Sequence, residues 1–263
     1  MIADNVNSVI SARGVSKEFD GASGRRVALA STDLDVRAGE FVALLGPSGC
    51  GKSTLLSLLG GFASPSSGEV LLDGRLLTAP DRRVVTIFQD YGLFPWRSVV
   101  GNIEYGLEVA GWNKSKRREE AMRWLAAVGL ADAAGAQVAE LSGGMKQRVN
   151  LARALAVSPE VLLMDEPLGA LDAITKAQVQ EQLRGIAQGS SATFVLVTHD
   201  IDEAVYLADR IMVMTSCPGT IAEEIAVPMA HPRDRSSMEF AHFRVRLLES
   251  LHLAHHAESE YDI

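Results

Sequence analysis

Residues 46–53 read GPSGCGKS, a glycine-rich run that satisfies the pattern GxxxxGK[ST]. The apolar run FVALL at residues 41–45 is typical of a buried strand, and from Lys52 apolar residues follow a helical spacing that stops at Gly60 and Gly61. A strand, a glycine loop and a helix in this order distinguish a phosphate-binding loop from a chance match. The sequence therefore predicts a loop whose backbone N–H groups and helix start hold phosphate groups.

The side chains of this loop suit a bound nucleotide and its metal. We expect Lys52 to reach the outer phosphates and the Ser53 hydroxyl to hold Mg²⁺. The other predicted nucleotide contacts are Gly46, Pro47, Ser48, Gly49, Cys50, Gly51 and Thr54. Because Cys50 lies at the helix start near Lys52, we also expect the helix dipole and the positive charge to favour its thiolate and make it reactive toward alkylators. The competing interpretation, a glycine turn with a surface lysine, is disfavoured by the flanking strand and helix.

Strand and helix patterns alternate along most of the chain. Residues 33–45 predict an edge hairpin that leads into the buried strand, and residues 69–77 predict a hairpin that turns at Asp73 and Gly74. Further strands are expected at residues 84–88, 161–164, 193–197, 211–214 and 220–227, and helices at residues 114–130, 174–188 and 238–253. Residues 91–159 are expected to be mostly helical. This alternation predicts an α/β fold with a largely parallel sheet.

The composition limits the class of protein. The chain has 263 residues and a formal net charge of −8, which argues against binding to nucleic acid or to an anionic membrane surface. Residues 1–14 lack the features of a signal peptide, and no apolar run approaches the ~18 residues that span a bilayer. Cys50 and Cys217 offer neither a disulfide framework nor metal-ligand spacing. We therefore expect a soluble, cytosolic protein.

Polar residues follow three of the expected strands. The run VLLMDE ends in Asp165 and Glu166, TFVLVT precedes His199, and VVTIF precedes Gln89. Because ligands of open α/β folds bind at the carboxyl ends of strands, we expect these residues to lie near the phosphates. Asp165 is predicted to bind the metal, Glu166 to orient or deprotonate the attacking water, and His199 to contact the γ-phosphate. Gln89 is a candidate ligand of Mg²⁺ or water. The competing interpretations are a charge pair at a helix start for residues 165–166 and a structural role for His199.

A second helix start shaped for an anion follows downstream. Residues 141–148 read LSGGMKQR and run directly into the helical pattern VNLARALA. Taken in order, the segments GPSGCGKS, FQ, LSGGMKQR, VLLMDEP, LGALD and VTHD resemble the nucleotide-binding subunits of ATP-binding cassette (ABC) transporters over about residues 10–227. The resemblance implies a P-loop NTPase (RecA-like) α/β core with an edge antiparallel β-subdomain and an inserted helical subdomain.

The resemblance also implies the domain organisation and the reaction. Residues 1–263 would form a single ABC ATPase domain, in which residues 1–90 and 159–230 make the catalytic core with its antiparallel β-subdomain. Residues 91–158 would make the helical signature subdomain, and residues 231–263 a C-terminal helical extension. The implied cofactors are ATP and Mg²⁺, and the implied activity is ATP hydrolysis coupled to transmembrane transport.

The second helix start acquires a role from the same resemblance. Ser142, Gly143 and Gly144 match the family positions that bind the γ-phosphate of an ATP held by a second copy of the chain. Two ATP molecules would thus be sandwiched in a head-to-tail dimer with two-fold symmetry. Asp172 in LGALD matches the residue that contacts the partner copy and couples the two sites. Phe19 is the candidate for stacking on adenine, with a core phenylalanine as the competing interpretation.

An aromatic cluster is the candidate surface for passing dimer closure to a partner. Its residues are Tyr91, Leu93, Phe94, Pro95 and Trp96. In the family this region receives a helix of an integral membrane permease subunit, and we expect Gln89 to sense the γ-phosphate and move the surface. The competing interpretation buries the cluster against its own domain. The implied location is the cytoplasmic face of the inner (plasma) membrane, with a periplasmic or lipid-anchored solute-binding protein as an indirect partner.

Finer resemblance selects a group of importers. The segments FQDYGLFPWRSVVGNIEYGLEVAG, LGALDAIT, SCPGTI and HPRDRSSMEF are similar to the nitrate, sulfonate and taurine group of importer ATPases. Taurine or another alkanesulfonate is the first expectation for the solute, and nitrate or another small anion is the alternative. A cassette ATPase of DNA repair or translation would need a long coiled-coil insertion or tandem cassettes, and a GTPase would need an NKxD-type guanine reader; we find none of these in the sequence.

Overall fold

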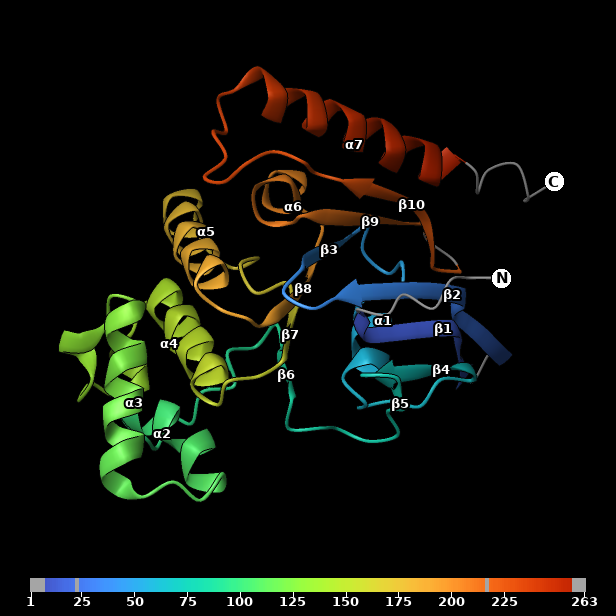
Figure 1. Cartoon of the computed structure of the whole chain (residues 1–263). Helices are drawn as coiled ribbons and strands as arrows, with labels where there is room; N and C mark the ends of the chain where they lie inside the picture. Colours follow the sequence, from blue (N-terminus) through green and yellow to red (C-terminus); the bar gives the residue numbers. More distant parts are fainter. Residues whose placement is uncertain (1–7, 22–23, 216–217, 257–263) are drawn as a thin grey trace. The chain divides into compact units, whose positions relative to one another are not determined.

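The computed structural model describes residues 8–21, 24–215 and 218–256 (Figure 1). The chain forms two compact units. The first unit comes from Met1–Asp81 and Thr193–Ile263, and the second from Arg82–Ala192. This division differs from the predicted subdomains, whose boundaries stay predictions.

An antiparallel sheet in the first unit comes from strands early in the chain. It runs in the order β2 (Gly24–Arg37), β1 (Ser8–Gly21), β4 (Ser67–Leu72) and β5 (Arg75–Leu76). The β4–β5 hairpin is confirmed, and its turn has left-handed backbone at Asp73 (φ 48°) and Gly74 (φ 71°), as a type I′ turn requires. The long β1–β2 hairpin escapes sequence prediction because its register shifts interrupt the alternation of apolar and polar residues.

The other sheet of the first unit is mainly parallel. β3 (Phe41–Leu45) pairs in parallel with both β8 (Thr193–Thr198) and β9 (Arg210–Thr215), and β10 (Thr220–Ala226) runs antiparallel to β9. Every residue of β3 and β8 is buried. The rings of Phe41 and Phe194 stack between these two strands with their centroids 5.3 Å apart. The strand that precedes the phosphate loop is therefore fixed on both of its edges.

The expectation of a hairpin at residues 33–45 is wrong. β2 and β3 are joined by a turn at residues 38–39, but they belong to different sheets. The reason lies in their burial: β2 alternates between buried and exposed residues near its end, whereas β3 is buried throughout. A strand with two buried faces needs cover on both sides, which a parallel sheet with helices supplies.

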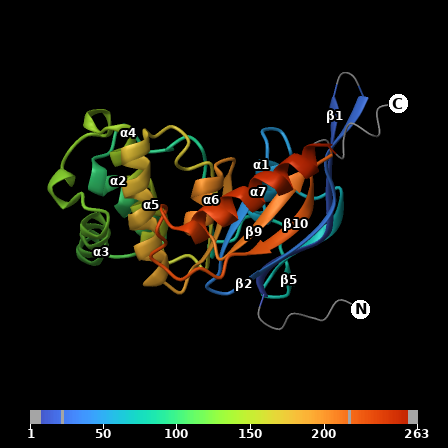
Figure 2. The ribbon, with the colours of Figure 1, turned by 90° about the horizontal axis from the view of Figure 1, so that it is seen from above.

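Three helices cover the parallel sheet of the first unit. α1 (Lys52–Leu59) begins directly after the glycine loop and ends at Gly60, as predicted. α6 (Ile201–Leu207) follows β8, and α7 (Met238–His256) packs on β9 and α6. Figures 1 and 2 show α7 running along β9 and β10. The predicted helix at residues 238–253 is thus confirmed, with its buried face formed by Phe240, Phe243 and Leu247.

The second unit combines two strands with a helical cluster. β6 (Val84–Ile87) pairs in parallel with β7 (Val161–Asp165), and α5 (Ala173–Gln188) follows β7. α2 (Val99–Val109), α3 (Lys114–Ala127) and α4 (Gly143–Ala156) pack around a common core, with 3₁₀ turns at Ala131–Ala133 and Val138–Glu140. The expectation that residues 91–159 are mostly helical is confirmed.

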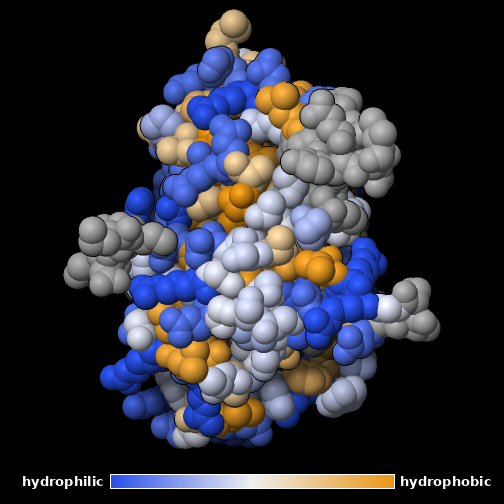
Figure 3. Space-filling model, turned by 90° about the vertical axis from the view of Figure 1, so that its right-hand side faces the viewer, coloured by the Kyte–Doolittle hydropathy of each residue, from blue (hydrophilic) through white to orange (hydrophobic). Residues whose placement is uncertain are grey.

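The described residues contain no helix that is long and apolar enough to cross a membrane. On the face seen in Figure 3, small hydrophobic patches are separated by hydrophilic residues. Scattered apolar side chains of this kind are normal on protein surfaces and do not by themselves mark an interface.

Buried Arg233 joins the segment after β10 to the end of α6. Only 5% of this residue is exposed. Its guanidinium donates hydrogen bonds to the carbonyl oxygens of Val205, Ala208 (2.6 Å), Val227 (2.9 Å) and Met229 (3.2 Å). Because a buried carbonyl without a donor lowers stability, one side chain here satisfies several backbone groups at once.

We expect Arg233→Met to lower the free energy of unfolding by roughly 3 kcal/mol, since methionine fills much of the volume but leaves these carbonyl oxygens without donors. Urea denaturation followed by circular dichroism measures the loss. Arg246→Met is the control, because Arg246 makes a partly exposed ion pair with Glu223 at 3.2 Å, and such pairs contribute less than about 1 kcal/mol. Equal losses in the two variants would contradict the importance of the Arg233 network.

Candidate active site

The glycines of the phosphate loop are required by its backbone. Gly49 (φ 83°) and Gly51 (φ 90°) both adopt the left-handed conformation, which side chains disfavour. A methyl group on Gly51 would lie 2.8 Å from the carbonyl oxygen of Ala28, and one on Gly46 would lie 2.9 Å from that of Met214. The loop therefore follows a path between β3 and α1 that only glycine allows at these positions.

Lys52 is held inside this loop. Only 4% of the residue is exposed, and its Nζ donates hydrogen bonds to the carbonyl oxygens of Gly46 (2.8 Å) and Pro47 (2.7 Å). Ser48 and Ser53 are exposed, and Thr54 in the first turn of α1 is half-buried. The loop thus places an ammonium group beside the N-terminus of a helix, and an anion bound there would meet two sources of positive charge.

The expectation of a reactive Cys50 thiolate is wrong. Cys50 is fully buried, and burial raises the pKa of its thiol above the usual range. Lys52, whose Nζ lies 3.8 Å from Sγ, lowers this pKa but does not offset the loss of solvent. The positive charge of Lys52 and the helix dipole follow from the sequence, but the burial of Cys50 does not. Cys217 lies outside the described residues.

His199 and the phosphate loop face one cavity within the first unit. His199 follows β8 directly and is exposed. Together with Gly46 and Pro47 it lines a cavity of about 260 Å³. The other lining residues are Leu248, Leu251 and His252 of α7. The amphipathic pattern of α7 predicts that one face is buried, but it does not reveal that the helix borders the phosphate loop.

The second unit brings Gln89 and the acidic pair to one edge of its strands. β6 and β7 pair in parallel with Ile87 opposite Met164. Gln89, two residues after Ile87, and Asp165, one residue after Met164, therefore leave the strands at the same end. Gln89 is exposed, whereas Asp165 and Glu166 are half-buried. The parallel pairing that the sequence predicts thus places an amide and two carboxyl groups at one end of this strand pair.

Glu166 has an unusual backbone. Its φ of 45° lies in the left-handed region, which costs a residue with a side chain about 1–2 kcal/mol. Its carbonyl oxygen accepts a hydrogen bond from the N–H of Gly169 at 3.2 Å, so the chain turns sharply as it leaves β7. Strained residues of this kind cluster at functional sites. No pattern in the sequence predicts this conformation.

The LSGG segment forms a helix start, as predicted. Ser142 is the N-cap of α4, and its hydroxyl oxygen accepts a hydrogen bond from the N–H of Met145 at 3.3 Å. Ser142 and Gly143 are exposed, but Gly144 is buried. A methyl group on Gly144 would overlap the side chain of Thr175 on α5. Gly144 therefore also permits the close packing of α4 against α5.

Asp172 and Phe19 have surroundings that bear on their predicted roles. Asp172 caps α5 by accepting hydrogen bonds from the N–H groups of Ile174 (3.2 Å) and Thr175 (3.0 Å), and the bonds from Thr175 lower the pKa of its carboxyl group. Phe19 on β1 is 48% exposed, with the Nζ of Lys17 5.3 Å from its ring centroid. The competing interpretation of Phe19 as a core residue is therefore wrong. The roles of Asp172 toward a partner copy and of Phe19 toward adenine stay predictions.

The aromatic cluster after Gln89 is divided between buried and exposed side chains. Phe94 is half-buried and packs edge-on against Tyr105 at 4.6 Å, and its ring centroid lies 5.4 Å from that of Trp96. Trp96 itself is 75% exposed. Each of the two interpretations of this cluster therefore holds for part of it: Phe94 packs on its own unit, and Trp96 is free to contact another molecule.

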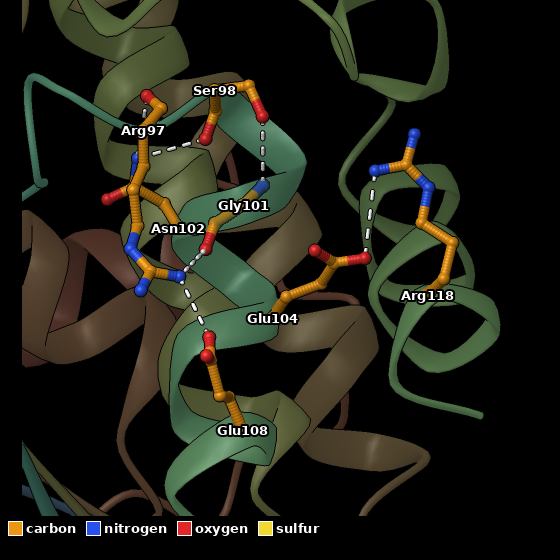
Figure 4. A network of polar contacts seen from close by, with 7 residues as sticks. All are labelled: Arg97, Ser98, Gly101, Asn102, Glu104, Glu108 and Arg118. Carbon is orange, nitrogen blue, oxygen red and sulfur yellow. Dashed lines mark hydrogen bonds and ion pairs between the residues drawn. The ribbon is translucent and has the colours of Figure 1, made fainter. Parts of the chain in front are cut away.

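Asn102 on α2 fixes this loop from one side (Figure 4). The residue is fully buried, and its Nδ2 donates to the carbonyl oxygens of Arg97 and Ser98. Beyond the residues drawn, its Nδ2 also donates to the carbonyl oxygen of Phe94, and its Oδ1 accepts from the N–H of Phe94 at 2.7 Å. Figure 4 also shows two ion pairs of α2: Glu108 pairs with Arg97 (3.0 Å), which precedes this helix, and Glu104 pairs with Arg118 of α3 (3.7 Å). The hydrogen bonds of the Asn102 side-chain amide thus hold the turn that carries Trp96.

The chain matches known proteins over most of its length. A family model described as ABC transporter matches residues 29–169. Among curated proteins, the chain is 44% identical to the nitrate import ATP-binding protein of Synechococcus elongatus, over 90% of this chain and 89% of the relative. It is 45% identical to the bicarbonate transport ATP-binding protein of Synechocystis (84% and 79% covered) and 44% identical to the taurine import ATP-binding protein of Yersinia pestis (83% and 84% covered).

A solved structure supports the fold class. An ATP-binding cassette determined as a dimer in a post-hydrolysis state, bound to ADP and phosphate, superimposes with a TM-score of 0.75. The two chains are 31% identical, and the match covers 84% of this chain and 100% of that one. This likeness confirms the predicted α/β fold of the P-loop NTPase class.

We expect iodoacetamide at neutral pH to alkylate Cys50 at least ~10-fold more slowly in the folded protein than in the urea-unfolded chain, because each unit of raised pKa cuts the thiolate fraction tenfold and burial limits access. Mass spectrometry of the peptide that contains Cys50 measures both rates without interference from Cys217. Faster reaction in the folded protein would restore the thiolate expectation.

Proposed function

Because the chain belongs to the ABC transporter family, as an ATP-hydrolysing subunit of the import group for nitrate, bicarbonate and taurine, we propose that it powers a bacterial importer through ATP-driven closure of a dimer of this chain. The phosphate loop is the observation that carries the proposal. Its left-handed glycines Gly49 and Gly51 turn the backbone, and Lys52 is held within it at the start of α1. This combination suits the triphosphate of a nucleotide.

The residues assigned to Mg²⁺ have suitable chemistry. Ser53 offers a hydroxyl oxygen, Asp165 a carboxylate and Gln89 an amide oxygen, and Mg²⁺ prefers oxygen ligands. When bound, Mg²⁺ neutralises charge on the phosphates and helps to orient them. Asp165 is half-buried at the end of β7, where its carboxylate is fixed by the strand rather than by a loop. This donor set supports a magnesium-bound nucleotide.

Three side chains have tasks in hydrolysis. Lys52 donates to the outer phosphates and stabilises the negative charge that shifts onto them. Glu166 orients or deprotonates the attacking water, and its left-handed backbone supports such a role because strained residues recur at active sites. His199 donates a hydrogen bond to the γ-phosphate from the cavity that it shares with Gly46 and Pro47.

The start of α4 is proposed to serve the nucleotide of a second copy. Ser142 and Gly143 are exposed at a helix N-terminus, where N–H groups and the helix dipole attract an anion. Two copies related by two-fold symmetry would each offer this helix start to the partner's γ-phosphate. Asp172 would contact the partner copy, and the exposed ring of Phe19 would stack on adenine.

The exposed turn at Trp96 is the proposed docking surface for a membrane permease. A tryptophan that is 75% exposed and held on a rigid turn suits the core of a protein interface, where aromatic residues are enriched. The chain would then lie at the cytoplasmic face of the inner membrane as a peripheral subunit. A periplasmic or lipid-anchored solute-binding protein would deliver the solute on the other side.

Taurine or another alkanesulfonate is the proposed solute, and nitrate or another small anion is the alternative. Identity does not choose between them, because the nitrate and taurine import relatives are both 44% identical to this chain. The proposal for taurine depends on the likeness of the segments around Gln89 and Asp172 to that group of importers. None of these segments is assigned a contact with the solute.

We expect Glu166→Gln to bind ATP but lose at least ~100-fold in turnover, or about 2.7 kcal/mol of transition-state stabilisation. Light scattering of this variant with Mg-ATP should show a monomer becoming a dimer, because ATP is bound between the copies and is not consumed. Persistence of the monomer with ATP bound would contradict the sandwich for the isolated chain.

Ser142→Arg in the Glu166→Gln background is the control for that experiment. Its added bulk and charge at the start of α4 should block dimer formation while the monomer still binds ATP, since Ser142 is assigned to the partner's nucleotide. Loss of ATP binding by the monomer itself would show that Ser142 serves its own nucleotide and that the two-copy account is wrong.

The solute is tested with the importer purified as a complex and reconstituted in liposomes with its solute-binding protein. We expect taurine to stimulate ATP hydrolysis and nitrate to leave it at the basal rate. Stimulation by nitrate alone would replace the alkanesulfonate assignment, and the Glu166→Gln complex controls for contaminating ATPases.

A further inference from the structure

Arg153 on α4 holds the segment that follows Gln89. Its Nη1 donates a hydrogen bond to the carbonyl oxygen of Gly92 at 2.6 Å, and its Nη2 donates to that of Tyr91 at 3.2 Å. The guanidinium carbon lies 5.7 Å from the centroid of the Phe94 ring. Arg153 is half-buried, and this burial lowers the pKa of its guanidinium group. The Arg153 side chain on α4 therefore contacts three residues of the segment.

The N-terminal end of α4 meets the same segment. A methyl group on Gly143 would lie 3.1 Å from the hydroxyl oxygen of Tyr91. Since Gly143 is the first residue of α4 and Arg153 lies ten residues later, these contacts span about 15 Å of helix at 1.5 Å per residue. Tyr91 thus contacts the helix start with its side chain and the distal half of the helix with its carbonyl oxygen.

Further hydrogen bonds hold both Arg153 and the segment that it contacts. Arg153 also donates a hydrogen bond from Nη2 to the Oδ1 of Asn150 at 2.8 Å, and Asn150 is only 2% exposed on the same helix. On the other side of the segment, Asn102 binds the backbone of Phe94, Arg97 and Ser98. Residues 91–98 are therefore fastened between α4 and α2, with Trp96 exposed at their tip.

From this arrangement we propose that Arg153 is a positioning residue that transmits movement of α4 to the docking surface at Trp96. The inference rests on the proposed function, in which the start of α4 binds the partner's γ-phosphate. It adds a route that differs from the one through Gln89, because it reports on the nucleotide of the opposite copy. A docking surface connected to both nucleotides responds only when the sandwich is complete.

The test uses the fluorescence of Trp96 in the full chain. Trp112→Phe and Trp124→Phe leave Trp96 as the single tryptophan, and Glu166→Gln preserves bound ATP. We expect Mg-ATP to shift the emission of Trp96 in this parent protein. Arg153→Ala should abolish the shift while light scattering still reports the ATP-dependent dimer, because the start of α4 is intact.

Two further variants guard against a purely structural effect. Arg153→Lys keeps the charge and one hydrogen bond but cannot donate from two nitrogens to two carbonyl oxygens, so it should restore part of the shift. We expect this variant to fold even if Arg153→Ala is unfolded. Arg148→Ala is the matched control: Arg148 lies on the same helix, but its guanidinium reaches the carbonyl oxygens of Gly144 and Val128, both at 3.4 Å. Its shift should match that of the parent.

The outcomes separate this inference from the proposed function. A full shift in Arg153→Ala, equal loss in Arg148→Ala, or no shift in a parent that dimerises with ATP would each overturn the link while leaving the ATP sandwich in place. A parent that neither binds ATP nor dimerises would refute the proposed function, and the inference with it.

Discussion

The close approach of the phosphate loop to neighbouring backbone is the constraint on which the first unit depends. Gly51 passes so near the carbonyl oxygen of Ala28 that no side chain fits, and Gly46 is equally close to the backbone of Met214. These contacts bring β2, β9 and the start of α1 together around one turn. Because β3 is buried and paired on both edges, the turn has a fixed origin, and Lys52 is aimed by the fold rather than by its own flexibility.

Several motif residues carry structural tasks beside their proposed chemical ones. Gly144 permits α4 to pack on Thr175, and Asp172 caps α5. A substitution at either position would therefore disturb packing as well as nucleotide chemistry, and loss of activity alone would not separate the two effects. Glu166 is a better probe, since it can change from carboxylate to amide with little change in shape, whereas a change at Ser142 also removes the N-cap of α4.

The sequence predicts the elements whose residues repeat with a clear period and the site residues that follow them. The strand before Gly46, the helix from Lys52 and the parallel pairing that brings Gln89 to the end of β7 are of this kind. Properties that depend on three-dimensional surroundings could not be predicted: the raised pKa of Cys50, the left-handed backbone of Glu166, and the position of α7 beside His199. The prediction of a hairpin at residues 33–45 is wrong for the same reason, because a local pattern does not say which sheet a strand joins.

The hydrogen bonds of Lys52 to the carbonyl oxygens of Gly46 and Pro47 have a consequence for the release of product. The ammonium group of Lys52 already has hydrogen-bond partners in its own loop. A bond to a phosphate would therefore contribute only the difference in free energy between the new hydrogen bonds and those that it replaces. In the proposed role of Lys52, its ammonium group would return to these two carbonyl oxygens when a phosphate leaves.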